Sequence, residues 1–139
     1  MITPAGAPFS MAMEVLAYFH GDARTLNYTP YTYGRGFADA HRRFAQAFLA
    51  LPAIKGTVVD QGDGDLKVRT YDSTNGTYVG VAYRGYAGKQ LAIKIPCDKA
   101  GATVENLVTG ENVPATAAGG SLQFNVASGP MELNAYLIH

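Results

Sequence analysis

The sequence predicts a mostly-β protein: an antiparallel β-sandwich of about seven strands that follows an N-terminal segment of two helices. Apolar residues keep helical spacing up to Pro52, and in the rest of the chain they alternate with polar residues. Turn-forming pairs such as Asn75-Gly76 divide that second part into short runs. We therefore expect a helical segment over residues 1–55 and a sandwich over residues 56–139.

Capping residues and apolar spacing predict the two helices. Ser10 can cap a first helix that runs to about Phe19 and stops at Gly21. A second helix over residues 36–51 carries its apolar residues on one stripe and ends at Pro52. Two short helices cannot bury such stripes against each other alone, so they must pack on the β region or on another domain or chain. We favour packing on the sheet, with some apolar surface left over.

The strands are predicted from runs in which apolar and polar residues alternate. They are expected over residues 57–60, 65–71, 77–83, 89–96, 102–108, 111–115, 122–126 and 131–137. The predicted inward row of the last strand is Met131, Leu133, Ala135 and Leu137. One face of each sheet is then apolar and the other polar, and two such sheets packed face to face bury both apolar sides.

Charge and composition exclude several classes of partner. Lys plus Arg and Asp plus Glu number 11 each, so no net field favours nucleic acid or anionic lipid. No run approaches the ~20 apolar residues that span a bilayer. The single Cys97 cannot form an internal disulfide and is expected to be a small buried residue at a strand end. None of these features indicates a compartment.

The first residues and the known site motifs give further expectations. Residues 1–8 lack the basic start and apolar run of a secretion signal, so we expect either a cytoplasmic chain or a piece of a longer one. No nucleophile elbow, phosphate loop, cysteine pair or His-Glu-x-x-His sequence is present. We therefore expect no catalytic residue, no metal and no cofactor in this chain.

The segment between the two helices is the densest aromatic stretch. It holds Tyr28, Tyr31 and Tyr33, stiffened by Pro30. Flat aromatic rings can stack on the C–H faces of sugars, so these tyrosines are candidate carbohydrate-binding residues. The alternative is that they fill the seam between helices and sheet, each hydroxyl with a backbone partner.

Two other polar groups have structural explanations. Asp60, Asp63 and Asp65 alternate with glycine as in a calcium loop, but no bidentate glutamate follows, and a solvated turn is favoured. His41 and Asp39 lie two apart on a predicted helix and face different directions, which argues against a metal or acid–base pair.

Five stretches of the β region carry a family resemblance. They are residues 76–84, 89–96, 102–111, 120–126 and 131–137. Together they resemble the C-terminal β-sandwich that follows the catalytic barrel in many glycoside hydrolases, and the Asn106–Glu111 hairpin is the most specific part. The resemblance covers about residues 57–138, and residues 37–54 resemble the last barrel helix and the link into the sandwich.

The resemblance implies a non-catalytic accessory domain of a carbohydrate-active enzyme. Its partner would be a catalytic barrel domain or another copy of itself, and the catalytic acids of such enzymes lie in the barrel, so none transfers to this chain. One alternative is an independent carbohydrate-binding module that uses the three loop tyrosines or exposed sheet tyrosines such as Tyr78, Tyr83 and Tyr86. Another is a small hydrolase complete in itself.

Overall fold

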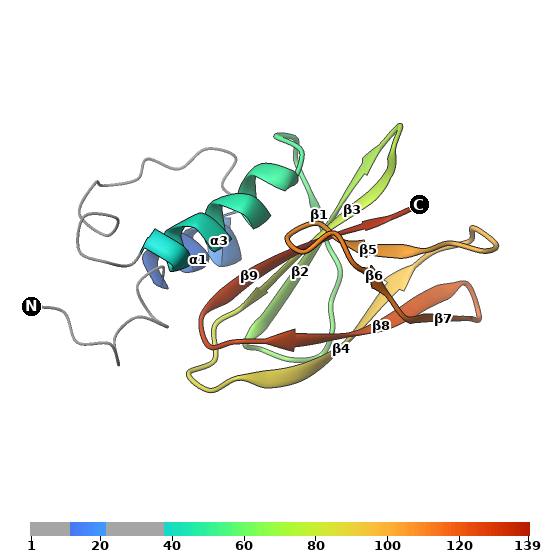
Figure 1. The fold of residues 1–139 in the computed structure, drawn as a ribbon. Coiled ribbons are helices and arrows are strands. Elements are labelled where there is room, and N and C mark those ends of the chain that lie inside the picture. The colour runs from blue at the N-terminus through green and yellow to red at the C-terminus, as the bar shows by residue number, and fades with distance from the viewer. Residues whose placement is uncertain (1–11, 22–37) are drawn as a thin grey trace, which may run out of the picture.

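The computed structural model describes residues 12–21 and 38–139, with side chains for residues 14–21 and 42–139. The described residues form three layers: two helices, a six-stranded sheet and a three-stranded sheet (Figure 1). This confirms the prediction of a mostly-β, sandwich-like fold with two helices. Neither described helix is long and apolar enough to cross a membrane.

The helices and strands have the following bounds. The helices are α1 (Ala12–Gly21) and α3 (Ala38–Ala50), and the strands are β1 (Thr57–Val58), β2 (Leu66–Ser73), β3 (Gly76–Tyr83), β4 (Lys89–Pro96), β5 (Val104–Asn106), β6 (Asn112–Val113), β7 (Ala115–Ala118), β8 (Ser121–Ser128) and β9 (Glu132–Ile138). Both helices end close to where Gly21 and Pro52 predicted.

All strand pairs are antiparallel. The larger sheet has the order β1-β2-β3-β9-β5-β6, and the smaller sheet has the order β4-β8-β7. The strand predicted over residues 111–115 is wrong in one respect: β6 ends at Val113, and after Pro114 the chain enters the other sheet as β7. Proline has no N–H to donate to a ladder, so pairing breaks there.

The first core lies between the two sheets. It contains the alternate residues Leu91, Ile93 and Ile95 of β4, which are 0–3% exposed, as the predicted alternation requires. Cys97 follows the end of β4 and packs half-buried against the same core. Each large aliphatic side chain buried here contributes about 1.5–3 kcal/mol relative to exposure.

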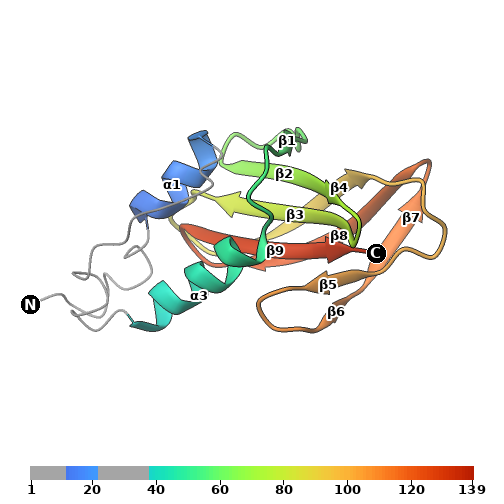
Figure 2. The same cartoon turned by 90° about the horizontal axis from the view of Figure 1, so that it is seen from above.

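The second core lies between the helices and the outer face of the six-stranded sheet. Figure 2 shows α1 and α3 on that face. The core contains Val15, Tyr18, Phe19, Phe44, Ala47, Phe48 and Leu51 from the helices and their C-terminal flank, and Tyr71, Ala82, Leu133 and Ala135 from the sheet. The helices therefore pack on the sheet, as their apolar stripes predicted.

This second core corrects two strand predictions. Leu133 and Ala135 of β9 point to the helices, whereas Tyr136 and Ile138 point into the sandwich, so the predicted inward row faces the helix layer. The predicted polar face of this sheet is also wrong, because the helices cover it. Alternating residues on both faces of β9 are buried.

A row of residues under α1 allows the helix to approach closely. Arg69 of β2, Gly80 of β3 and Ala135 of β9 are register partners across the sheet. A Cβ atom at Gly80 would overlap the hydroxyl oxygen of Tyr18 and lie 3.0 Å from the Leu51 Cδ1 atom. The Tyr18 hydroxyl is 2.6 Å from the Tyr71 hydroxyl. Gly80 thus makes room for a buried tyrosine pair.

We expect Gly80→Ala to lower the free energy of unfolding by about 2 kcal/mol, because the methyl group overpacks the site of Tyr18. Tyr18→Phe removes the overlapping hydroxyl, so the double variant should lose less stability than the sum of the two single variants. Urea unfolding of the four proteins measures this coupling. Strict additivity would contradict the proposed contact.

Candidate functional site

The tyrosines predicted as carbohydrate-binding residues lie partly outside the described part of the chain. Tyr28, Tyr31 and Tyr33 lie outside the described residues. Of the three tyrosines expected to be exposed, Tyr86 is 79% exposed in the β3–β4 turn, whereas Tyr78 is partly buried against the second core. The expectation that Tyr83 is exposed is wrong: it is 6% exposed, because its ring belongs to the core between the sheets.

The acidic loop before β2 is built as a turn. The backbone N–H of Gly62 donates to Asp60 Oδ1 at 2.8 Å, and that of Asp65 donates to Asp63 Oδ1 at 2.9 Å. Lys89 Nζ lies 3.3 Å from the Asp63 carboxylate. These contacts support the turn interpretation. In the described part of the chain, no three His, Cys, Asp or Glu side chains are grouped so as to hold a metal.

A hollow of about 280 Å³ lies beside this loop, near the C-terminal end of α1. It is lined by Phe19, Val58, Val59, Asp60, Asp63, Gly64, Leu66, Lys67 and Val68. Lys67 Nζ lies 5.2 Å, and Arg84 Cζ 4.7 Å, from the centroid of the Phe19 ring. The ring is therefore engaged by two cations of the protein itself, which makes it a poor stacking platform for a sugar.

The charge state of Asp63 argues against an acid role for this hollow. The pKa of Asp63 is lowered mainly by the hydrogen bond from the Asp65 backbone N–H, with a further contribution from Lys89 and partial opposition from burial. A general acid in glycoside hydrolysis needs the opposite, a raised pKa. Asp63 is thus an ionised turn residue at neutral pH.

This lowered pKa predicts a small acid-dependent loss of stability. Since the pKa of Asp63 is lower in the folded state, its stabilising contribution is present above its ordinary pKa of about 4 and is lost as the pH falls through the folded value. At pH 7 we expect the free energy of unfolding of wild type to exceed that of Asp63→Asn by less than about 1 kcal/mol, and the difference to shrink as the pH falls below the ordinary pKa of an aspartate. Urea unfolding at pH 7 and at a series of acidic pH values tests this, and Lys89→Gln should reduce the pH dependence.

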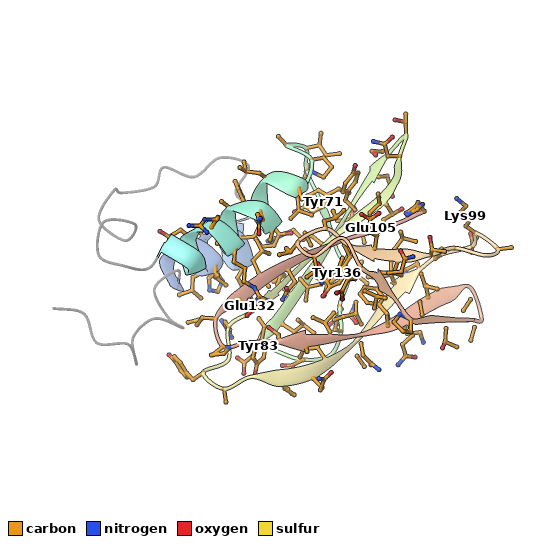
Figure 3. The ribbon with its side chains drawn as sticks, viewed as in Figure 1. Tyr71, Tyr83, Lys99, Glu105, Glu132 and Tyr136 are labelled. Carbon is orange, nitrogen blue, oxygen red and sulfur yellow. The ribbon has the colours of Figure 1, made fainter. Side chains whose placement is uncertain are left out.

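A second group of polar side chains surrounds Glu132 at the start of β9 (Figure 3). Arg43 Nη2 of α3 lies 2.6 Å from Glu132 Oε1. The Gly129 backbone N–H donates to Oε2 at 3.1 Å, and the Asn134 side-chain amide donates to Oε1 at 3.2 Å. Both carboxylate oxygens therefore serve to fix α3 and the β8–β9 turn to the sheet.

Tyr136 is a near neighbour of this group. Burial raises the pKa of Tyr136 to about 12, and the charge of Glu132 adds to the effect. The Tyr136 ring packs on Phe124 with centroids 5.2 Å apart, inside the core between the sheets. Its hydroxyl is thus neutral at physiological pH, and the residue acts as a core residue.

The polar residues that join the layers were not predicted from the sequence. Arg69 is 4% exposed and donates to the Tyr18 and Phe19 carbonyl oxygens at the end of α1, the second at 3.1 Å. Glu132 binds Arg43 across 89 residues of sequence. The available signal was weak: an arginine inside the β2 run that shares a face with Lys67 and Tyr71.

The comparisons with known proteins give structural matches alone. A scan against protein-family models finds no match, and a search of curated protein sequences finds none. Among solved structures, α-galactosidase I from Mortierella vinacea is 10% identical, with 93% of this chain and 35% of that chain covered and a TM-score of 0.46.

Two other solved structures are similar over part of the chain. The α-fucosidase of Thermotoga maritima in complex with fucose is 17% identical, with 73% of this chain and 25% of that chain covered and a TM-score of 0.45. AmyP in complex with maltotriose is also 17% identical, with 61% and 16% covered and a TM-score of 0.45. The chain thus spans 16% to 35% of the length of these three structures.

Proposed function

We propose that this chain is a non-catalytic accessory domain of a carbohydrate-active, glycoside-hydrolase-like enzyme, and that it packs on a catalytic barrel. The sequence resemblance of residues 57–138 to the sandwich domains of such enzymes supports the enzyme class. The non-catalytic role is supported by the carboxylates, which bind structural partners within the fold.

Glycoside hydrolysis needs two carboxyl groups about 5–10 Å apart across the scissile bond, one of them protonated. The carboxylates described above have structural partners instead. Glu132 holds Arg43 and two N–H donors, and Asp63 holds a turn N–H and Lys89. Asp65 pairs with Arg84 at 3.2 Å. The contacts of Glu132 are the observation that carries the proposal. Of Glu132, Asp63 and Asp65, Glu132 has the least exposed side chain, at 18%, and its carboxylate is occupied by structural partners.

The test of the non-catalytic role is an activity assay of the isolated chain on a panel of nitrophenyl α- and β-glycosides. We expect no release of nitrophenol above the level of a buffer control. Turnover by wild type that is lost in Glu132→Gln or Asp63→Asn, with folding retained, would overturn the proposal. Asp72→Asn is a matched control, because Asp72 accepts a hydrogen bond from Thr77 in the β2–β3 hairpin, away from both groups.

Exposed apolar side chains suggest where a partner would pack. Leu49 on α3 is 75% exposed, Ile54 in the link is 44% exposed, and Val58 on β1 is 53% exposed. These residues follow one another along the chain from the helix layer to the edge of the larger sheet. Large apolar side chains on a surface are typical of contact sites when they are grouped.

If the partner is a second copy, wild type should form dimers or larger oligomers as its concentration rises. The double variant that carries Leu49→Lys and Ile54→Lys should remain monomeric. Light scattering across a concentration series measures this. Tyr86→Lys, which changes a comparably exposed residue in the β3–β4 turn, is the matched control. A monomeric wild type would leave a separate barrel domain as the proposed partner.

A carbohydrate-binding module is the second candidate, because Tyr86 is 79% exposed and the aromatic segment of the sequence adds Tyr28, Tyr31 and Tyr33. Titration with maltotriose, fucose and galactose, monitored by chemical shifts, distinguishes the two functions. We expect no saturable response from a support domain. A saturable response would favour the binding module if it is abolished by Tyr86→Ala or by a variant with alanine at Tyr28, Tyr31 and Tyr33.

A further inference from the structure

The smaller sheet closes one of its edges with a side chain. Gln61 Oε1 accepts a hydrogen bond from the Lys94 backbone N–H at 2.9 Å, and Gln61 Nε2 donates to the Lys94 carbonyl oxygen at 3.0 Å. The same Nε2 also donates to the Val59 carbonyl oxygen at 3.2 Å. The Gln61 amide thus takes the place of a neighbouring peptide group beside the edge strand β4. An edge that is covered in this way is protected from pairing with another chain.

The other edge is covered over half of its length. β7 pairs with residues Ser121–Phe124 of β8 and goes no further. Residues Asn125–Ser128 pair with β4 on one side. β7 cannot extend along them, because Pro114 precedes it and the chain there comes from the other sheet. We call the strand position beside Asn125–Ser128 the open lane.

The direction of the backbone groups in the open lane follows from the Gln61 contact. Since Lys94 directs its N–H and C=O to Gln61, its register partner Gln123 directs its own groups away from β4. Alternation places Asn125 and Ala127 in the same orientation. In the described part of the chain, Ala127 makes no hydrogen bond on this side. Its N–H and C=O therefore face the open lane.

The start of the open lane is hollowed and uncharged. A cavity of about 400 Å³ lies there, lined by Pro114, Ala115, Thr116, Gln123, Phe124 and Asn125. None of these side chains carries a formal charge. The lining therefore offers no opposite charge to a charged side chain, whereas its amide and hydroxyl groups can hydrogen-bond a polar one.

We propose that the open lane docks an extended, uncharged peptide segment, which adds a strand to the smaller sheet beside β8. Backbone groups that point outward from a sheet recognise an extended backbone, and the neighbouring pockets select its alternate side chains. The neutral lining selects small polar or β-branched residues over charged ones. The lane can accept such a segment whether or not the chain belongs to a carbohydrate-active enzyme.

The length of the open lane favours a peptide segment over a second copy. Four strand residues span about 13 Å, and a pairing of that length buries much less than the roughly 1,200 Å² of a stable dimer interface. A free segment would bind weakly. A segment tethered in the same polypeptide or complex gains an effective concentration in the mM range, which offsets that weakness.

The test uses an acetylated, amidated peptide Gly-Thr-Val-Thr-Val-Thr-Gly and the full chain. On titration, we expect shifts of the Asn125 and Ala127 amide signals and slower exchange of the Ala127 amide proton. A peptide with the same sequence but N-methylated at both valines should give no response, because it cannot form the ladder.

Two proline variants form a matched pair. Ala127→Pro removes the N–H that faces the lane and should weaken binding about five- to tenfold. Gln90→Pro is its control: Gln90 is the exposed register partner of Ala127 on β4, and its N–H faces the opposite edge. If a proline prevents folding, the N-methylated peptide carries the comparison, because it removes the same ladder hydrogen bonds from the other partner.

Each outcome decides the proposal. A response in wild type that Ala127→Pro weakens, and Gln90→Pro does not, supports it. No response of Asn125 and Ala127 at millimolar peptide overturns it, and so does an equal loss in both variants or an equal response to the N-methylated peptide. Slow exchange of Ala127 that depends on protein concentration alone, without peptide, would overturn it in favour of a second copy as the occupant.

Discussion

Arg69→Met is expected to lower the free energy of unfolding by about 3 kcal/mol and to release α1 from the sheet. Arg69 is buried, donates to the carbonyl oxygens of Tyr18 and Phe19, and lies 5.0 Å from the centroid of the Tyr18 ring. The last carbonyl groups of a helix lack partners inside the helix, and a cation there also meets the negative end of the helix dipole. Methionine fills similar space but leaves those carbonyl groups buried without a donor.

The control is Lys67→Met on the same strand and the same face. Lys67 also lies over an aromatic ring of α1, at 5.2 Å from the Phe19 centroid, but its side chain is only half-buried. We expect it to cost less than about 1 kcal/mol. Urea unfolding gives the free energies, and helical circular dichroism reports α1. Equal losses in the two variants would contradict the capping role of Arg69.

Ile93→Ala is expected to be the most damaging single substitution considered, at about 4 kcal/mol. Ile93 is 0% exposed at the centre of β4, opposite Phe124 of β8, and both belong to the core between the sheets. Truncation loses buried apolar surface and leaves a cavity that two rigid sheets cannot close.

Lys94→Ala, one residue along on the exposed face, is the control for Ile93→Ala. Its side chain makes no described core contact, and the backbone bonds of Lys94 to Gln61 remain. We expect a change within about 0.5 kcal/mol. Thermal unfolding of both variants measures the contrast. A small loss in Ile93→Ala would mean that the two sheets are packed less tightly than described.

The sequence predicted the elements better than their faces. Alternation and turn residues located most strands, because a period of two residues reports any strand with one buried face. The same pattern assigned Leu133 and Ala135 to the sandwich, although they lie under the helices. Alternation defines two faces of a strand but does not say which layer covers each. That choice depends on the helices, which are distant in sequence.

The polar contacts were harder to predict from sequence than the cores. Gln61 and Lys94 are 33 residues apart, and Arg43 and Glu132 are 89 apart. Such contacts need both partners to be placed by the fold, and no local spacing encodes them. The turn role of Asp60 and Asp63 was predictable, since each bonds a backbone N–H two residues away.

The small residues under α1 also constrain how this protein can diverge. Gly80, Ala82 and Ala135 are small residues of the sheet against which Tyr18 and Leu51 pack. A larger side chain at one of these sheet positions is compatible only with a smaller side chain packed against it. Relatives that keep both helices should therefore vary at these positions in a correlated way. Relatives without the helices should tolerate larger side chains at these sheet positions.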